Sequence, residues 1–150
     1  MDKRLCQLSE LELSCYGCCA GKYFSEKAMK DQIKENTESF HEAKDKKEWG
    51  CRERTILSKK SICYNIIKDE NLYVCALHPM RNDGVELRPD ARCDIVSNCE
   101  SYDRFSHWYG IIKDEFIDFI KSKNMSSYDY SFGIVTGMLI KEFERSHDKK

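Results

Sequence analysis

The last third of the chain has the clearest hydrophobic pattern. Apolar side chains recur there every three or four residues, which is the spacing of one face of a helix. The members of this face are Phe105, Trp108, Tyr109, Ile112, Phe116, Phe119 and Ile120. We expect this helix to end at Asn124.

A second helix is predicted directly after it. Ser126, with Asp129 three residues on, resembles a capping box, in which two side chains satisfy amides at the start of a helix. The apolar face then continues through Phe132, Val135, Met138, Leu139 and Phe143. Because few residues join the two helices, we expect them to pack antiparallel over about 100–146.

Earlier in the chain, the pattern predicts one more helix, over about 25–46. Ser25 can cap it, and Glu26 lies in the first turn, where negative charge is favourable. Its apolar stripe is thin, and the charged run 44–48 is typical of a solvated helix end. We expect the residues before it, up to about 24, to form an irregular loop.

The middle of the chain changes to the pattern of short strands. Segments 62–67 and 72–77 are rich in β-branched and aromatic residues, and the polar turn 68–71 between them predicts a β-hairpin. Both prolines follow within a turn-rich stretch, so we expect little core in the 50–100 region. The predicted class is α+β, mostly helical, with a small β-hairpin in a loop-rich region packed on the two C-terminal antiparallel helices.

Composition narrows the class of protein. A chain of 150 residues with 41% hydrophobic and 34% charged residues fits one globular domain, 1–150. It has no apolar run of about 18 residues and no signal-peptide pattern, so we expect a cytoplasmic protein without a membrane partner. Lysine and arginine number 25 against 26 acidic residues, which argues against a large nucleic-acid surface. The sequence indicates no particular protein partner.

The nine cysteines are the outlier in this composition. A disulfide framework is typical of secreted chains with an even cysteine count, and a cytoplasmic compartment is reducing. Buried thiols acting as small hydrophobic groups would explain only some of the nine. Metal ligation is therefore the economical interpretation.

Cysteine spacing identifies the candidate ligands. Cys15 and Cys18 have the two-residue spacing by which one loop presents two thiolates to one metal ion. Cys19 is adjacent to Cys18, and adjacent side chains seldom bind one small ion alike, so either one of them lies beside the site or the centre is polynuclear. The candidate ligands are Cys15, Cys18, Cys19, Cys63, Cys75, Cys93 and Cys99. The metal-binding part then spans about 6–99, and the helical part spans about 100–146.

The order of these cysteines resembles that of the YkgJ-type cysteine-cluster family. The likeness covers about residues 15–99 and rests on Cys15, Cys18, Cys19, segments 62–64 and 75–79, and Arg88-Pro89 followed by Cys93. That family is described as a zinc- or iron-chelating domain. The resemblance therefore implies metal binding, and it implies no particular reaction.

The sequence leaves the identity of the metal centre open between zinc and a 4Fe–4S iron–sulfur cluster. Cys75-x-x-His78 would suit zinc, whereas seven or more thiols exceed the needs of one zinc ion and favour iron–sulfur. His78 is either a ligand or a hydrogen-bonded loop residue. We expect Cys6 and Cys51 to be spare or buried thiols.

Three arginines lie in the same loop-rich segment of the sequence as several of the cysteines. Arg81, Arg88 and Arg92 are either solvated or offset the negative charge of a thiolate site. The pattern favours an accessory or redox metal-binding protein. Two other functions stay open: an enzyme that uses the cluster or a free thiolate in redox or sulfur-transfer chemistry, and a zinc-stapled interaction module. The sequence contains no motif that assigns a reaction.

Overall fold

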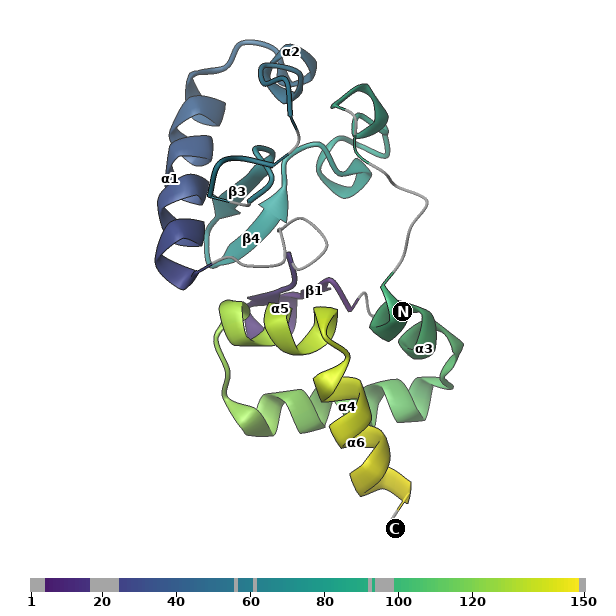
Figure 1. Cartoon of the computed structure of the whole chain (residues 1–150). Coiled ribbons are helices and arrows are strands. Elements are labelled where there is room, and N and C mark those ends of the chain that lie inside the picture. Colours follow the sequence, from purple (N-terminus) through teal and green to yellow (C-terminus); the bar gives the residue numbers. More distant parts are fainter. Residues whose placement is uncertain are drawn as a thin grey trace. The chain divides into compact units, whose positions relative to one another are not determined.

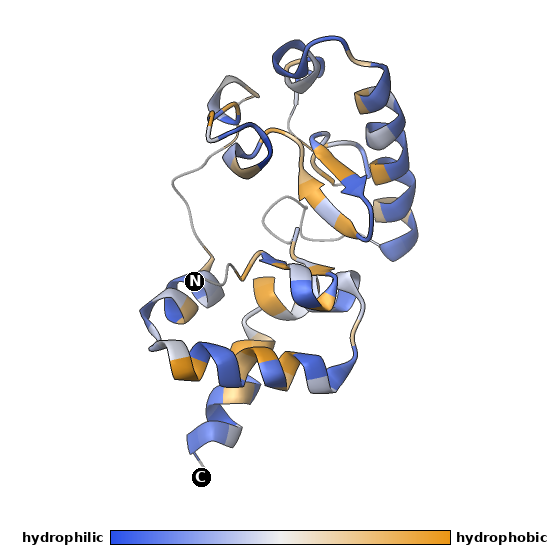
Figure 2. Cartoon of the chain, turned by 180° about the vertical axis from the view of Figure 1, so that it is seen from behind, coloured by the Kyte–Doolittle hydropathy of each residue, from blue (hydrophilic) through white to orange (hydrophobic). Residues whose placement is uncertain are grey.

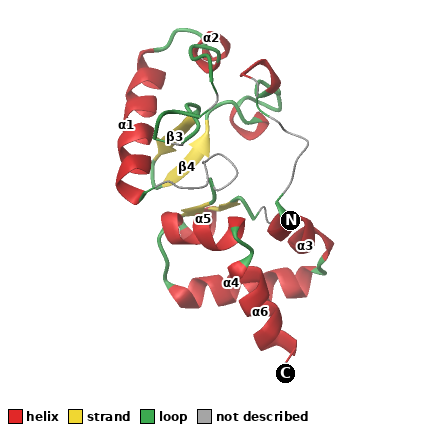
Figure 3. Cartoon of the chain, viewed as in Figure 1, coloured by secondary structure: helices red, strands yellow, loops and turns green. Residues whose placement is uncertain are grey.

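The computed structural model describes residues 5–16, 25–55, 57–60, 62–91, 93 and 99–148. In chain order, its strands and helices are β1 (Gln7–Leu8), β2 (Leu13–Ser14), α1 (Glu26–Glu42), α2 (Lys46–Gly50), β3 (Ile66–Asp69), β4 (Leu72–Cys75), α3 (Glu100–His107), α4 (Gly110–Lys123), α5 (Ser127–Val135) and α6 (Met138–Asp148) (Figure 1). Helices dominate and the strands form small antiparallel pairs, as Figure 3 shows. The predicted α+β, mostly helical class is confirmed.

The chain forms two compact units. The terminal unit consists of Met1–Cys18 and Asn98–Lys150, and the central unit consists of Cys19–Ser97. Residues 5–16 pack with the C-terminal helices, and the prediction that the metal-binding part spans about 6–99 stays a prediction. That the whole chain is one domain stays a prediction.

The terminal unit begins with a hairpin where an irregular loop was expected. β1 and β2 pair antiparallel, with Gln7 opposite Ser14 and Leu8 opposite Leu13. Strands of two residues are too short to show an alternating pattern, so the sequence did not reveal them. The hairpin contributes to one hydrophobic core with the helices, formed by Leu5, Leu8, Leu13, Phe105, Phe116, Ile117, Ile120, Tyr130, Ile134, Leu139, Ile140 and Phe143.

Two predicted helix boundaries in this unit are confirmed. Asn124 ends α4 in the left-handed conformation, with φ 48°. The Ser126 hydroxyl accepts a hydrogen bond from the Asp129 amide at 3.1 Å and so caps α5.

The prediction of two C-terminal helices was wrong, because each is divided in two. The backbone is extended at Trp108 and Tyr109, which separates α3 from α4. Gly137, with φ +77°, separates α5 from α6. The spacing pattern continues across the first break because Trp108 still packs on Phe116, with ring centroids 5.6 Å apart.

The central unit begins with α1, which starts as predicted. The Ser25 hydroxyl accepts from the Ala28 amide at 3.1 Å. The helix ends at Glu42, earlier than expected, because the Asp45 side chain caps the separate short helix α2. The Trp49 side chain on α2 is buried.

The predicted β-hairpin is present with shorter strands. β3 pairs with β4 so that Ile66 lies opposite Cys75 and Asp69 opposite Leu72. Glu70, with φ 54°, lies in the turn. The expectation of little core in this region was wrong: the orange hairpin in Figure 2 belongs to a core of Trp49, Ile67, Val74, Ala76, Leu77 and Ala91.

Among the residues that the structure describes, none of the helices combines the length and the apolar character that crossing a membrane requires.

Candidate metal centre

Three of the predicted ligands that the structure describes belong to the central unit, and Cys63 is the most firmly held of them. Its side chain is buried, and its backbone forms an isolated bridge with Leu57. The Asn36 side-chain amide, on α1, donates to the carbonyl oxygens of Cys63 at 3.1 Å and Ile66 at 2.9 Å. These bonds fix the backbone on both sides of the Cys63–Ile66 turn.

Arg52 links α2 to the same turn. Its guanidinium stacks on the Trp49 indole, 3.9 Å from the ring centroid, and donates to the Trp49 carbonyl at 2.8 Å. It also donates to the backbone carbonyl of Tyr64. Burial lowers the pKa of Arg52, and the nearby Glu53, Cys63 and Tyr64 oppose that shift. A cationic group therefore lies near the Cys63 thiol.

Cys75 lies at the end of β4, close to two other thiols. Burial raises the pKa of its thiol to about 12, an amide hydrogen bond from Leu77 opposes the shift, and Cys63 and Cys93 raise it further. Arg88 also opposes it. Cys63 and Cys93 therefore each lie near Cys75, and we call these three residues the central thiol group.

Backbone amides also point at the sulfurs of this group. The Asn65 amide donates to the Cys63 sulfur at 3.4 Å, and the Leu77 amide donates to Cys75. In both cases the donor lies two residues after the cysteine. Hydrogen bonds of this kind favour the thiolate, which is the form that binds metal.

Arg88 connects the central thiol group to its loop. Its guanidinium makes a two-point ion pair with Glu86, at 2.8 and 2.6 Å, which lowers the pKa of that carboxyl to about 2. The Cys93 amide donates to the Arg88 carbonyl at 3.1 Å. Hydrogen bonding to Glu86 raises the pKa of Arg88, and Cys75 and Cys93 contribute to the same shift. The idea that Arg88 offsets thiolate charge thus has a structural basis.

The other predicted arginines lie elsewhere or are not described. Arg81 pairs with Asp69 on β3. Arg92 lies outside the described residues.

The His78 imidazole stabilises the backbone of its own loop. Its Nδ1 accepts a hydrogen bond from the Met80 amide at 3.1 Å and caps the short 3-10 turn Pro79–Arg81. A neutral ring that accepts at Nδ1 carries its proton on Nε2, so neither nitrogen has a lone pair left for a metal. This geometry favours the loop-residue interpretation of His78.

Cys15 and Cys99 belong to the terminal unit. The Cys15 amide donates to the Cys6 carbonyl at 2.9 Å, which extends the β1–β2 pairing by one residue pair. Cys99 caps α3, and its sulfur accepts from the Tyr102 amide at 3.4 Å. Burial raises the pKa of Tyr130 well above its usual value, and Cys15, Cys6 and Cys99 each add to the shift. Cys6, Cys15 and Cys99 thus each lie near the Tyr130 phenol.

Two parts of the predicted site stay untested. Cys18 and Cys19 lie outside the described residues. The assignment of Cys15 and Cys75 as metal ligands also stays a prediction. Within the described ranges, no three side chains of cysteine, histidine, aspartate or glutamate form a ready-made metal cage.

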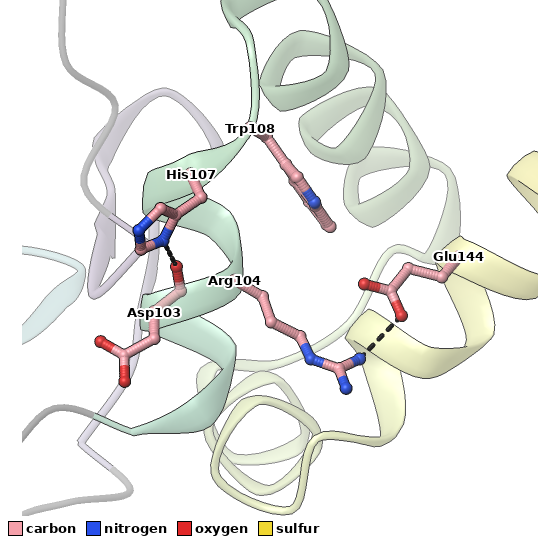
Figure 4. Close-up of a pocket in the computed structure, with 5 residues that line it drawn as sticks. All are labelled: Asp103, Arg104, His107, Trp108 and Glu144. Atoms are coloured by element: carbon pink, nitrogen blue, oxygen red, sulfur yellow. Dashed lines mark hydrogen bonds and ion pairs between the residues drawn. The ribbon is translucent and has the colours of Figure 1, made fainter.

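A shallow hollow of about 370 Å³ lies in the terminal unit (Figure 4). It is lined by Asp103, Arg104, His107, Trp108 and Glu144. Arg104 pairs with Glu144 at 2.8 Å and with Glu100 at 3.1 Å, and His107 Nδ1 bonds to the Asp103 carbonyl oxygen. Arg104 and Glu144 pair with each other, the His107 ring bonds to the backbone, and the lining contains no cysteine, so we place no site there.

Comparison with family models, curated proteins and solved structures finds no match for this chain. The resemblance to the YkgJ-type family therefore stays a prediction, and the arrangement of the thiols carries the functional argument.

Proposed function

We propose that this protein is a small metal-binding protein with an accessory or redox role, whose central thiol group holds an iron–sulfur cluster or zinc. Cys63, Cys75 and Cys93 supply three thiolates. The adjacent pair Cys18–Cys19 supplies a further one, as the sequence spacing predicts. The observation that carries the proposal is the grouping of three thiols from separate parts of the chain.

The surroundings of the group suit a thiolate centre. Amides point at the sulfurs of Cys63 and Cys75, and the guanidiniums of Arg52 and Arg88 lie nearby. A centre with four thiolates carries excess negative charge, which both kinds of group stabilise. The donor chemistry therefore fits zinc or an iron–sulfur cluster.

A loaded centre requires its thiolate sulfurs to lie close together. Metal–sulfur bonds of about 2.3 Å put tetrahedral thiolates about 3.8 Å apart. Metal loading must also remove protons, since the Cys75 thiol is protonated at neutral pH. For the same reason Cys75 is a poor nucleophile without metal, which argues against an enzyme that uses it as a free thiolate.

Anaerobic purification, metal analysis and a visible spectrum test the proposal. A brown protein with broad absorption near about 400 nm would identify iron–sulfur, and a colourless protein with stoichiometric zinc would identify zinc. Cys63→Ser and Cys75→Ser should each lose the central metal, whereas Cys51→Ser, at an exposed cysteine, should keep it. A wild-type protein that binds neither under reducing conditions would refute the proposal.

A further inference from the structure

The β1–β2 hairpin places two cysteines opposite each other. Gln7 pairs with Ser14, so the next pair is Cys6 and Cys15, joined by the 2.9 Å hydrogen bond from the Cys15 amide to the Cys6 carbonyl. Opposed residues of an antiparallel pair have Cα atoms about 4.5–5.5 Å apart and side chains on the same face. A disulfide spans Cα atoms about 4.4–6.8 Å apart, so this pairing lies within its reach.

Helix α5 holds the backbone beside both cysteines. The Tyr130 hydroxyl donates to the Leu5 carbonyl at 2.6 Å, directly before the first cysteine. The Ser131 hydroxyl donates to the Ser14 carbonyl at 3.2 Å and accepts from the Tyr16 amide at 3.1 Å, on either side of the second cysteine. These hydrogen bonds are buried, so breaking them is costly and the two cysteines stay opposite each other.

The two thiols differ in their access to solvent. Cys6 is exposed, whereas Cys15 is partly buried and packs against the core of the terminal unit. The Cys15 sulfur lies 4.0 Å from the Ser131 carbonyl oxygen, to which its thiol can donate. Redox-sensitive sites pair an accessible cysteine, which the oxidant reaches, with a second cysteine that resolves the product. Exposure therefore assigns the reaction with oxidant to Cys6 and the resolving step to Cys15.

We propose that Cys6 and Cys15 form a reversible disulfide in response to a peroxide, which makes the β1–β2 hairpin a redox modification site. The inference gives a role to Cys6, which the sequence pattern treats as a spare thiol. It is independent of the proposed function, which uses neither cysteine. In a reducing compartment the pair rests as two thiols, and transient disulfides of this kind serve redox sensing there.

The disulfide forms in two steps, written here for hydrogen peroxide. The Cys6 thiolate attacks one peroxide oxygen, so that a sulfur–oxygen bond forms, the oxygen–oxygen bond breaks, and hydroxide leaves with the electron pair. The Cys15 sulfur then loses its proton and attacks the sulfenic acid at Cys6, which forms the sulfur–sulfur bond and releases the oxygen as water. The two cysteines lose two electrons and the peroxide gains them. A dithiol reductant reverses the reaction by thiol–disulfide exchange.

Oxidation of the reduced full-length protein with equimolar hydrogen peroxide tests the inference. After alkylation of the remaining thiols, cleavage at Glu10 and Glu12 separates Cys6 from Cys15, and mass spectrometry with fragmentation locates the bond. We expect a bond between Cys6 and Cys15, with a mass loss of about 2 Da that a dithiol reverses. A bond from Cys6 to any other cysteine, or Cys6 without a bond, would overturn the inference.

Matched serine variants check the role of each cysteine. Cys15→Ser should leave Cys6 as a sulfenic acid that a 1,3-diketone reagent traps, because the resolving thiol is gone. Cys51→Ser removes another exposed cysteine and should form the bond at the wild-type rate. Equal trapping in the wild-type protein and in Cys15→Ser, or loss of the bond in Cys51→Ser, would contradict a direct reaction between Cys6 and Cys15.

Discussion

Asn36 on α1 holds Cys63 through the backbone, by a 3.1 Å hydrogen bond from its side-chain amide to the Cys63 carbonyl oxygen. The same amide donates to Ile66, and Asn36 is 1% exposed. A helix distant in sequence thus positions a proposed ligand without touching the metal. Such a residue should affect both stability and metal affinity.

We therefore expect Asn36→Ala to destabilise the protein by about 1–3 kcal/mol, because it removes the bond to the Ile66 carbonyl and leaves the Cys63 carbonyl only the 3.3 Å bond from the Ile66 amide. Denaturant unfolding measures this loss. Metal affinity should fall with it, since Cys63 is no longer held. Glu38→Ala, at an exposed position on the same helix, is the control and should change neither quantity. Equal behaviour of the two variants would show that Asn36 does not support the site.

Arg88→Gln should weaken metal binding at the central thiol group about tenfold, a loss typical of residues that support metal ligands. The substitution removes a positive charge near Cys75 and Cys93. Competition with a chromophoric chelator gives the affinity. Arg81→Gln breaks a comparable ion pair with Asp69 and should leave the affinity unchanged. A similar loss in both variants would indicate a general effect on the loop.

The metal-free protein should lose stability in alkali. The folded-state pKa of Cys75, about 12, exceeds the ordinary value of 9.0, so the folded state holds this proton more tightly than the unfolded chain does. The resulting stability is fully present below about pH 9 and is lost as the pH rises toward 12. Unfolding free energies across this range, measured after chelation, test it. Cys75→Ala should show a smaller alkaline loss, and an identical loss would contradict the assignment.

Cys18→Ser and Cys19→Ser should differ in effect, because adjacent thiols cannot easily make equivalent bonds to one ion. One variant should lose a metal, since each thiolate supplies a large share of the binding free energy. The other should keep that metal and change only its reactivity toward oxidant or alkylating reagent. Metal content and alkylation rates measure both. Full metal and unchanged reactivity in both variants would remove this pair from the site.

Metal removal should lower amide protection most in residues 62–93, where short strands and 3-10 turns connect the central thiols. Helix α4 should keep its protection, because its apolar side chains Phe116, Ile117 and Ile120 are buried in the core of the terminal unit. Hydrogen exchange on metal-loaded and metal-free protein compares the two. Unchanged protection of residues 62–93 would mean that the core around Trp49 suffices to order this region.

The sequence predicted correctly the helix boundaries that depend on interactions between neighbouring residues. The caps Ser25 and Ser126 and the stop at Asn124 each act within a few residues, and all three are confirmed. The break at Trp108 was hidden because a periodic apolar face survives a change of backbone direction when the side chain still reaches the core.

Grouping of the cysteines depends on tertiary contacts, and spacing alone could not supply it. Cys6 and Cys15 are brought opposite each other by a hairpin with two-residue strands. Cys63 and Cys75 do fall near each other, as the predicted hairpin implied, although Cys63 lies before β3 and not on it. The supporting contacts of Asn36 and Arg52 carry no local signal, because a buried asparagine on a helix looks like any polar position.

The hydrogen bond from Tyr130 to Leu5 has a consequence for the order of events during translation. A ribosome completes the central unit, Cys19–Ser97, while α5 is still to be made. The central thiols can therefore gather on the nascent chain, whereas Cys6 and Cys15 wait until residue 130 has emerged from the exit tunnel. Cys6 and Cys15, which are synthesised before the central cysteines, thus reach their final surroundings after them.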